Sequence, residues 1–209
     1  QLGDRLSEFE SLVIRANIAA KQQNRHASDD LFARLQPLAA TLAGAVPEPL
    51  LGKYRQALAL NALDSKDFSS AQSLWELNLA EGSGVELPDY NASLRWYALC
   101  LARQGAPNAR EWLERSRSHS QQFGFARALA RTNLEIAKFD LNDPSSGVGA
   151  EAILGALDSL ETEIADLKDP IYLAEYLDTR SQTMRRLGRF PEAEVLADQA
   201  KDVRGGVPS

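Results

Sequence analysis

The chain has 209 residues, of which 44% are hydrophobic and 25% are charged, a balance that allows an ordinary buried core. Its 29 acidic residues outnumber the 23 basic ones, and the formal charge is −6. The chain therefore lacks the net basic character of a typical nucleic-acid-binding domain, and no nucleic-acid partner is expected. Ala and Leu are abundant while runs rich in Val, Ile and Thr are missing, which favours helices over strands.

The sequence says little about the cellular compartment in which the protein resides. Cys100 is the single cysteine, so no intrachain disulfide can form. This mildly favours the cytoplasm over the periplasm and leaves the localisation unknown. No apolar run approaches the ~20 residues that a membrane-spanning helix needs, and we expect no signal peptide. Because the chain starts at Gln1 with helical periodicity at once, we expect it to be part of a larger protein or a processed mature form.

Apolar periodicity and turn signals predict ten helices that pair into five hairpins. In chain order, the helices are expected over residues 2–22 and 28–44, 48–64 and 67–81, 88–104 and 107–122, 124–141 and 148–167, and 170–187 and 191–203. One domain over residues 1–204 would thus contain repeats 2–44, 48–81, 88–122, 124–167 and 170–203. The tail 205–209, "GGVPS", is expected to be disordered.

The last hairpin has the clearest turn. Gly188 is expected to end its first helix, because glycine adopts the left-handed conformation without steric cost. Phe190 is expected to pack into the corner, and Pro191 to lie in the first turn of the next helix. One face of that helix then carries small residues at steps of four and three, which allow close packing: Ala193, Ala197 and Ala200.

The same step recurs through the chain at intervals of 38 to 43 residues. Its anchor positions are Leu31, Ala71, Ala109, Ala152 and Ala193. In the fourth hairpin the predicted packing face consists of Ala152, Ala156 and Ser159. Pro37 lies inside the second helix, where a kink is expected. A period of this length indicates an array of stacked structural repeats.

The turn "LGRFPEAEVLADQA" resembles the hairpin turn of the tetratricopeptide repeat, in which a Gly, an aromatic residue and an Ala mark the step between the two helices. The small residue that the family places seven positions before the Gly is present as Ala98 and Ser181. The family repeat has 34 residues, so this chain resembles a degenerate relative with longer repeats. It is similar to the helical arrays of large bacterial transcription regulators of the maltose-regulator type, or to those of peptide-sensing regulators. The resemblance implies an all-α, right-handed superhelical stack of about five hairpins, an α-α solenoid.

The resemblance also implies a function without catalysis, in which the first helices line a concave groove for a protein or peptide partner. The groove positions that it selects are Arg95, Arg103, Arg127, Arg131, Asn133, Asp178, Gln182, Arg185 and Arg186. Arg127 and Arg131 are four residues apart and share a helix face. Because a guanidinium can hold two oxygens at once, an acidic segment is the expected ligand. The alternative for each arginine is a solvated helix face or an ion pair with a neighbouring acid.

The residues needed for catalysis are sparse. The two histidines, His26 and His119, lie in polar stretches and are expected at the surface, while Cys100 lies on the apolar side of its helix. The Cys and His spacing of a zinc site and a phosphate-binding glycine loop are both missing. We therefore expect no enzyme, no metal and no cofactor.

Two further possibilities remain open at this point. The chain could be a ligand-sensing module of a multidomain bacterial regulator, in which a ligand shifts the stack and alters an attached domain. It could also form a homodimer through a terminal helix. The first helix is the candidate for this contact because of its apolar stripe.

Overall fold

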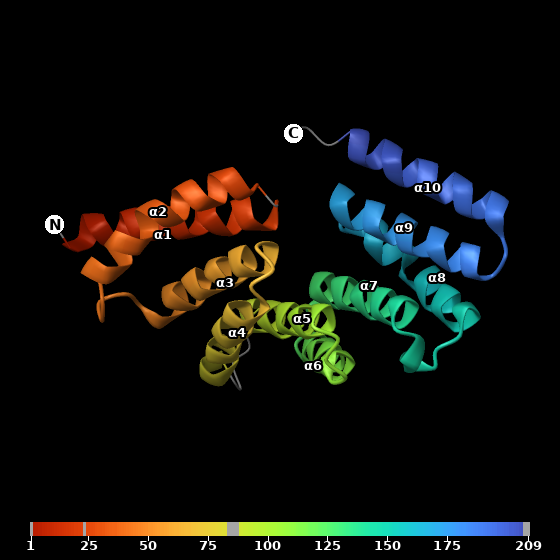
Figure 1. Cartoon of the computed structure of the whole chain (residues 1–209), viewed down its shortest axis with the longest axis horizontal. Helices are drawn as coiled ribbons and strands as arrows, with labels where there is room; N and C mark the ends of the chain where they lie inside the picture. The colour runs from red at the N-terminus through yellow and green to blue at the C-terminus, as the bar shows by residue number, and fades with distance from the viewer. Residues whose placement is uncertain (1, 23, 83–87, 207–209) are drawn as a thin grey trace. The chain divides into compact units, whose positions relative to one another are not determined.

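The computed structural model describes residues 2–22, 24–82 and 88–206, and these residues form ten α-helices, one short 3-10 helix and no strand (Figure 1). They divide into two compact units, Gln1–Ala109 and Arg110–Ser209, which are called unit 1 and unit 2 below. Residues 83–87 and most of the predicted tail lie outside the described residues. The expected all-α class and the stacking of helical hairpins are confirmed.

Unit 1 contains five helices: α1 (Leu2–Lys21), α2 (Arg25–Thr41), α3 (Glu48–Asp64), α4 (Phe68–Gly82) and α5 (Pro88–Arg103). Helix α1 packs against α2 and α3, and α3 packs in turn against α4 and α5, so each first helix contacts its own partner and the next first helix. The core between α1, α2 and α3 includes Phe9, Val13, Leu35 and Ala57, all fully buried. Helix α2 continues through Pro37.

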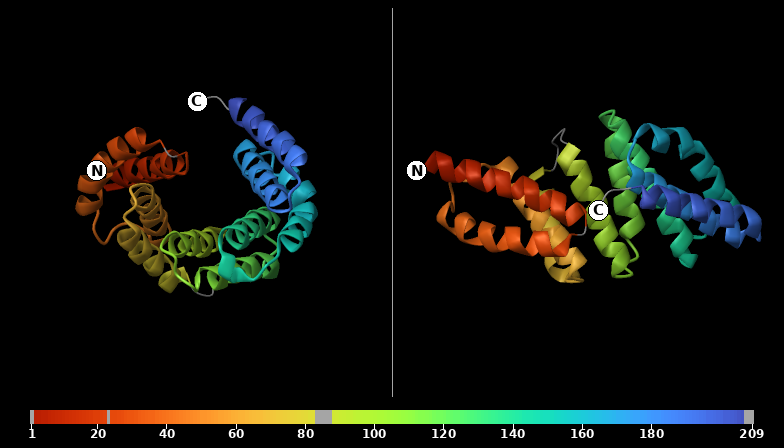
Figure 2. Two further views of the ribbon diagram at one scale, coloured as in Figure 1. Left: turned by 45° about the vertical axis from the view of Figure 1, so that its right-hand side comes forward. Right: turned by 90° about the horizontal axis from the view of Figure 1, so that it is seen from above.

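Unit 2 contains α6 (Ala109–Gln122, of which Ala109 itself belongs to unit 1), α7 (Ala126–Asn142), the 3-10 helix η1 (Pro144–Ser146), α8 (Ala150–Asp166), α9 (Pro170–Arg186) and α10 (Phe190–Gly205). Helix α7 packs against α8 and α9, and α9 packs against α8 and α10. Figure 2 shows α9 and α10 lying side by side. Leu134, Leu157 and Ile164 are almost fully buried in the core of this unit.

Five of the described corners share one conformation, in which the second residue after the helix has a positive φ angle. Gly188 adopts φ 74°, and Gly105 and Gly124 adopt similar values. At Gly188 the amides of residues 188 and 189 donate to the carbonyls of Arg185 and Met184, which closes the end of α9. Lys66 (φ 62°) and Lys168 (φ 52°) occupy the same kind of corner without being glycine.

Two sequence-based details are wrong. In α8 the packing face is shifted by one residue, because Ile153, Leu157 and Leu160 are buried while the predicted Ala152, Ala156 and Ser159 are exposed. Both sets step by four and three, and the larger apolar set gains more from burial. Phe190 does not pack into its corner but is 60% exposed at the start of α10. At the other anchor positions Ala71, Ala109 and Ala193 are fully buried as expected, and on the last predicted face Ala200 is buried while Ala197 is only half-buried.

Candidate interaction face

The nine predicted groove residues fall in both units, and each unit is described by itself. Arg95 and Arg103 lie on α5 of unit 1. Arg95 is only 6% exposed, and its guanidinium lies 5.9 Å from the ring centroid of Trp96. Arg103 is exposed in the last turn of α5. Within unit 1, Arg103 is therefore the more accessible of the two.

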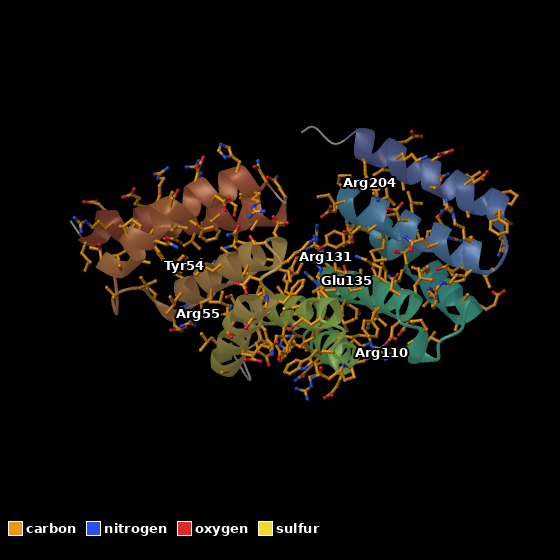
Figure 3. The ribbon with its side chains drawn as sticks, in the orientation of Figure 1. Tyr54, Arg55, Arg110, Arg131, Glu135 and Arg204 are labelled. Atoms are coloured by element: carbon orange, nitrogen blue, oxygen red, sulfur yellow. The ribbon has the colours of Figure 1, made fainter. Side chains whose placement is uncertain are left out.

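Arg127 and Arg131 lie on one face of α7 and reach toward the corner between α8 and α9. The Arg127 guanidinium donates to the carbonyl of Leu167 at 3.2 Å. The Arg131 guanidinium donates to the Asp169 carboxylate at 3.1 Å and lies 4.3 Å from the ring centroid of Tyr172. Asp169 also accepts a hydrogen bond from the amide of Ile171 and so caps α9. Arg131, which is labelled in Figure 3, thus links α7 to the first turn of α9 through these contacts.

Asn133 lies away from these arginines. Successive helical residues are rotated by about 100°, so a residue two positions from Arg131 points to nearly the opposite side of α7. Asn133 is half-buried there. The structure therefore does not bring Asn133 together with Arg127 and Arg131.

About two turns beyond Arg131 along α7, Lys138 lies between two carboxylates. Its ammonium is 3.1 Å from Glu135 of the same helix and 3.0 Å from Glu175 of α9. Burial alone would lower the pKa of Lys138, but the charges of Glu135 and Glu175 outweigh burial and hold that pKa above its ordinary value. Glu135 is itself only 6% exposed, so the lysine neutralises a buried acid and joins α7 to α9.

Helix α9 carries a row of side chains at steps of three and four that remains partly or fully exposed, here called the α9 stripe: Glu175, Asp178, Gln182 and Arg185. Asp178 forms an ion pair with Arg204 of α10. Gln182 and Arg185 are exposed, as is Arg186 next to them. Among the described residues no carboxylate pairs with Arg185 or Arg186. Lys201 of α10 lies near enough to Arg185 for the two positive charges to repel each other.

These contacts form an ion-pair ladder, defined by Arg131–Asp169, Lys138–Glu175 and Arg204–Asp178, that connects α7 to α9 and α9 to α10. Its members mostly neutralise one another. The end of α9 that carries Arg185 and Arg186 is different, because its guanidinium groups face solvent. Within unit 2, Arg185 and Arg186 therefore place two exposed positive charges next to each other at the C-terminal end of α9.

Sequence reasoning missed the partners in this ladder. The Glu135–Lys138 pair is a local signal, because residues three apart are neighbours on a helix. Asp169 directly before Pro170 is a recognisable helix-start signal. Its pairing with Arg131, 38 residues away, has no local signal in the sequence.

The two histidines and the cysteine, which the sequence analysis considered as candidate catalytic groups, differ in their exposure. His26 is exposed as expected, but His119 is half-buried, and its ring centroid lies 4.7 Å from that of Phe123. Cys100 is fully buried as expected, and burial raises the pKa of its thiol. Within the described part of the chain, no group of three or more His, Cys, Asp or Glu side chains could hold a metal ion. None of the described helices is both long and apolar enough to cross a membrane.

Comparison with known proteins identifies the fold. No protein-family model matches the sequence, and no curated protein sequence matches it. BtubC (BKLC) from P. vanneervenii is structurally similar, with a TM-score of 0.67 and 15% identity over 96% of this chain and 82% of that one. A putative kinesin light chain from Podosopora anserina with nearly identical TPR-like repeats has a TM-score of 0.63 and 17% identity, with 95% of each chain covered. A second structure of that kinesin light chain has a TM-score of 0.65 and 17% identity over the same share of both chains. The chain therefore has the fold of the tetratricopeptide-like (TPR-like) helical-repeat proteins.

Proposed function

We propose that this chain is a non-enzymatic protein-interaction module whose unit 2 binds an acidic segment of a protein or peptide partner at the C-terminal end of α9. A TPR-like repeat fold is typical of protein-interaction scaffolds, which supports the general type of function. The observation that carries the specific proposal is the exposed pair Arg185 and Arg186, which has no acidic partner among the described residues. Gln182, one turn earlier, adds a neutral donor and acceptor.

The chemistry of this site favours carboxylates. A guanidinium presents a planar fork of donors that can hold both oxygens of a carboxylate. Lys201 of α10 adds a third positive charge near Arg185, although Asp198 pairs with it at 2.8 Å. Asp178 lies one turn before Gln182 and is already neutralised by Arg204. An acidic segment along the α9 stripe would therefore meet positive charge at one end and little net charge in the middle.

A purely structural role for the two arginines is the competing explanation. Positive side chains in the last turn of a helix stabilise the carbonyl end of its dipole by about 0.3–1 kcal/mol. Arg185 and Arg186 lie in that last turn of α9. The two explanations differ in outcome, because the dipole effect changes stability only, whereas the proposed site changes affinity for an acidic ligand.

The remaining predicted residues have different parts in this proposal. On α7, the Arg127 guanidinium donates one hydrogen bond to a backbone carbonyl. Arg127 extends the proposed site toward α7. Arg131 supports α9 through Asp169 and Tyr172 and so positions the stripe. Arg95, Arg103 and Asn133 lie outside the proposed site on α9.

The test is a binding titration with fluorescent peptides rich in Asp and Glu, followed by anisotropy at low and at physiological salt. The double variant Arg185→Ala/Arg186→Ala should weaken binding by about tenfold or more, because each lost charge-assisted contact is worth roughly 1.5–3 kcal/mol when fully formed and less when exposed. Arg189→Ala is the matched control, since Arg189 is also exposed in the same corner but pairs with Glu192 at 3.0 Å.

Peptides in which Asn and Gln replace Asp and Glu provide the ligand control. The proposal predicts that they bind more weakly than the acidic peptides and with less salt dependence. Equal affinity for acidic and neutral peptides would show that charge does not select the ligand. An unchanged affinity in the Arg185→Ala/Arg186→Ala variant would place the binding site elsewhere.

A further inference from the structure

Helix α1 has two different faces. In the apolar stripe that led us to expect a homodimer contact, Phe9, Val13 and Ala16 are fully buried against α2 and α3, and only Leu2 at its start is well exposed. The opposite face carries a second row at steps of four, three and four, here called the α1 outer row: Ser7, Ser11, Ile14 and Ile18. Figure 2 shows α1 at the red end of unit 1.

The α1 outer row combines exposed apolar groups with small residues. Ile14 is 46% exposed and Ile18 is 50% exposed, and the two side chains lie on the same face of α1. Ser7 and Ser11 precede them, and their small side chains protrude little from the helix. This part of α1 forms a shallow depression of about 310 Å³, which is lined by Ser7, Glu10, Ser11, Ile14 and Arg15. Steps of four and three along one face are the pattern of the contact positions in a two-stranded coiled coil.

Two opposite charges flank this row. Helical geometry places Glu10 on one side of it and Arg15 on the other. Both side chains are exposed, and among the described residues neither forms an ion pair. They are five residues apart, which is the spacing at which flanking charges meet between two parallel helices packed in register. The row therefore has the charge pattern of a helix that pairs with a copy of itself.

The charge arrangement also selects the orientation. In a parallel pair with twofold symmetry, Glu10 of each chain meets Arg15 of the other, so two ion pairs form. The same alignment places Ile14 against Ile14 and Ile18 against Ile18, and the serines allow the helices to approach each other. In an antiparallel pair the flank that carries Glu10 meets the same flank of the second copy, and Glu10 and Arg15 cannot pair.

We propose that α1 mediates a weak parallel self-association of this protein through the α1 outer row, with Glu10 of each copy paired to Arg15 of the other. The occupant of this face is a second copy of the same chain. The contact spans about three helical turns and is smaller than a standard stable interface, so a dissociation constant on the order of 10–100 µM is expected. This contact lies in unit 1 and does not depend on the ligand proposed for unit 2.

Sedimentation equilibrium over roughly three decades of protein concentration around that value tests the association. Glu10→Arg and Arg15→Glu should each weaken it by about tenfold or more, because each turns two attractive contacts into two repulsive ones. The double variant Glu10→Arg/Arg15→Glu restores opposite charges and should bring the dissociation constant back to within about threefold. A chain that stays monomeric at the highest concentration would overturn the proposal, and so would a double variant that remains as weak as the single ones.

Cysteine cross-linking tests the orientation in the same protein. Ser7→Cys and Ile18→Cys, introduced separately, should both give an oxidised dimer, because a parallel in-register pair brings each position next to its own copy. An antiparallel pair can bring only one of two such distant positions together. Ser69→Cys, an exposed position on α4, is the matched control and should stay monomeric, and the native Cys100 is fully buried. Dimer from only one of the two α1 variants would refute the parallel arrangement.

Discussion

Replacing Arg131 with alanine separates the structural role of a predicted groove residue from a binding role. The substitution removes an ion pair of 3.1 Å to Asp169, in which the side chains are 27% and 25% exposed. It also removes the contact between the guanidinium and the Tyr172 ring at 4.3 Å. A partly exposed ion pair contributes about 0.5–1 kcal/mol, and a cation–π contact at such a site contributes about 0.5–1 kcal/mol.

The expected loss of stability is therefore about 1–2 kcal/mol. The lower part of this range is favoured, because the Arg131 Nε is buried without a hydrogen-bond partner and its removal relieves that cost. For a chain of this length a loss of 1 kcal/mol lowers the melting temperature by roughly 2–4 °C. Urea unfolding monitored by far-ultraviolet circular dichroism measures the free energy directly. Because the two units need not unfold together, the curve is first tested for a single transition.

A double-mutant cycle isolates the ion pair within this total. Asp169→Asn removes the charge but keeps a side-chain oxygen that can still cap the amide of Ile171. The coupling energy between Arg131→Ala and Asp169→Asn should be about 0.5–1 kcal/mol. A coupling near zero, together with an unchanged free energy of unfolding in Arg131→Ala, would refute the view that Arg131 supports α9. Arg131 would then be free to bind a partner.

Two other substitutions test the corners and the buried hydroxyl groups. Lys168→Gly should stabilise the chain by about 0.5–1 kcal/mol. It releases about 1–2 kcal/mol of strain, because Lys168 has the left-handed φ of 52°. Glycine offsets part of this gain, because it has more conformational freedom to lose when the chain folds. Lys168→Ala keeps the strain and should give no gain, and equal stability of the two variants would contradict the explanation. Burial and the hydrogen bond to Glu76 raise the pKa of Tyr97 to about 12, so its contribution to stability is complete below about pH 10 and lost between pH 10 and 12. Difference titration of the phenolate absorbance against Tyr97→Phe checks this, and ionisation of Tyr97 near pH 10 would contradict it.

Local signals in the sequence predict the helices and most of their corners. Gly105 and Gly188 end their helices in the left-handed conformation, as only glycine does without strain. The corners at Lys66 and Lys168 lack that signal, and there the helix ends had to be inferred from the apolar periodicity. In α8 periodicity was ambiguous, because two rows of residues one position apart show the same steps. Burial of Ile153 in place of Ala152 resolved it.

The candidate site could be predicted only as a set of helix positions. The sequence places Arg131 and Arg185 on the exposed faces of first helices, and both look alike at that level. In the structure Arg131 pairs with Asp169, while no described carboxylate pairs with Arg185. Asp169, which distinguishes the surroundings of Arg131 from those of Arg185, is 38 residues from Arg131 in the sequence. No local sequence pattern could therefore distinguish the two arginines.

The sequence by itself determined the helical class, the hairpin repeat and the positions of the glycine corners, because each depends on backbone preferences and contacts within a few residues. Only the tertiary structure decided which charged side chains neutralise one another and which stay open to solvent. The physical reason is that an ion pair requires two groups within a few ångströms, and helices far apart along the chain come that close only after they have packed.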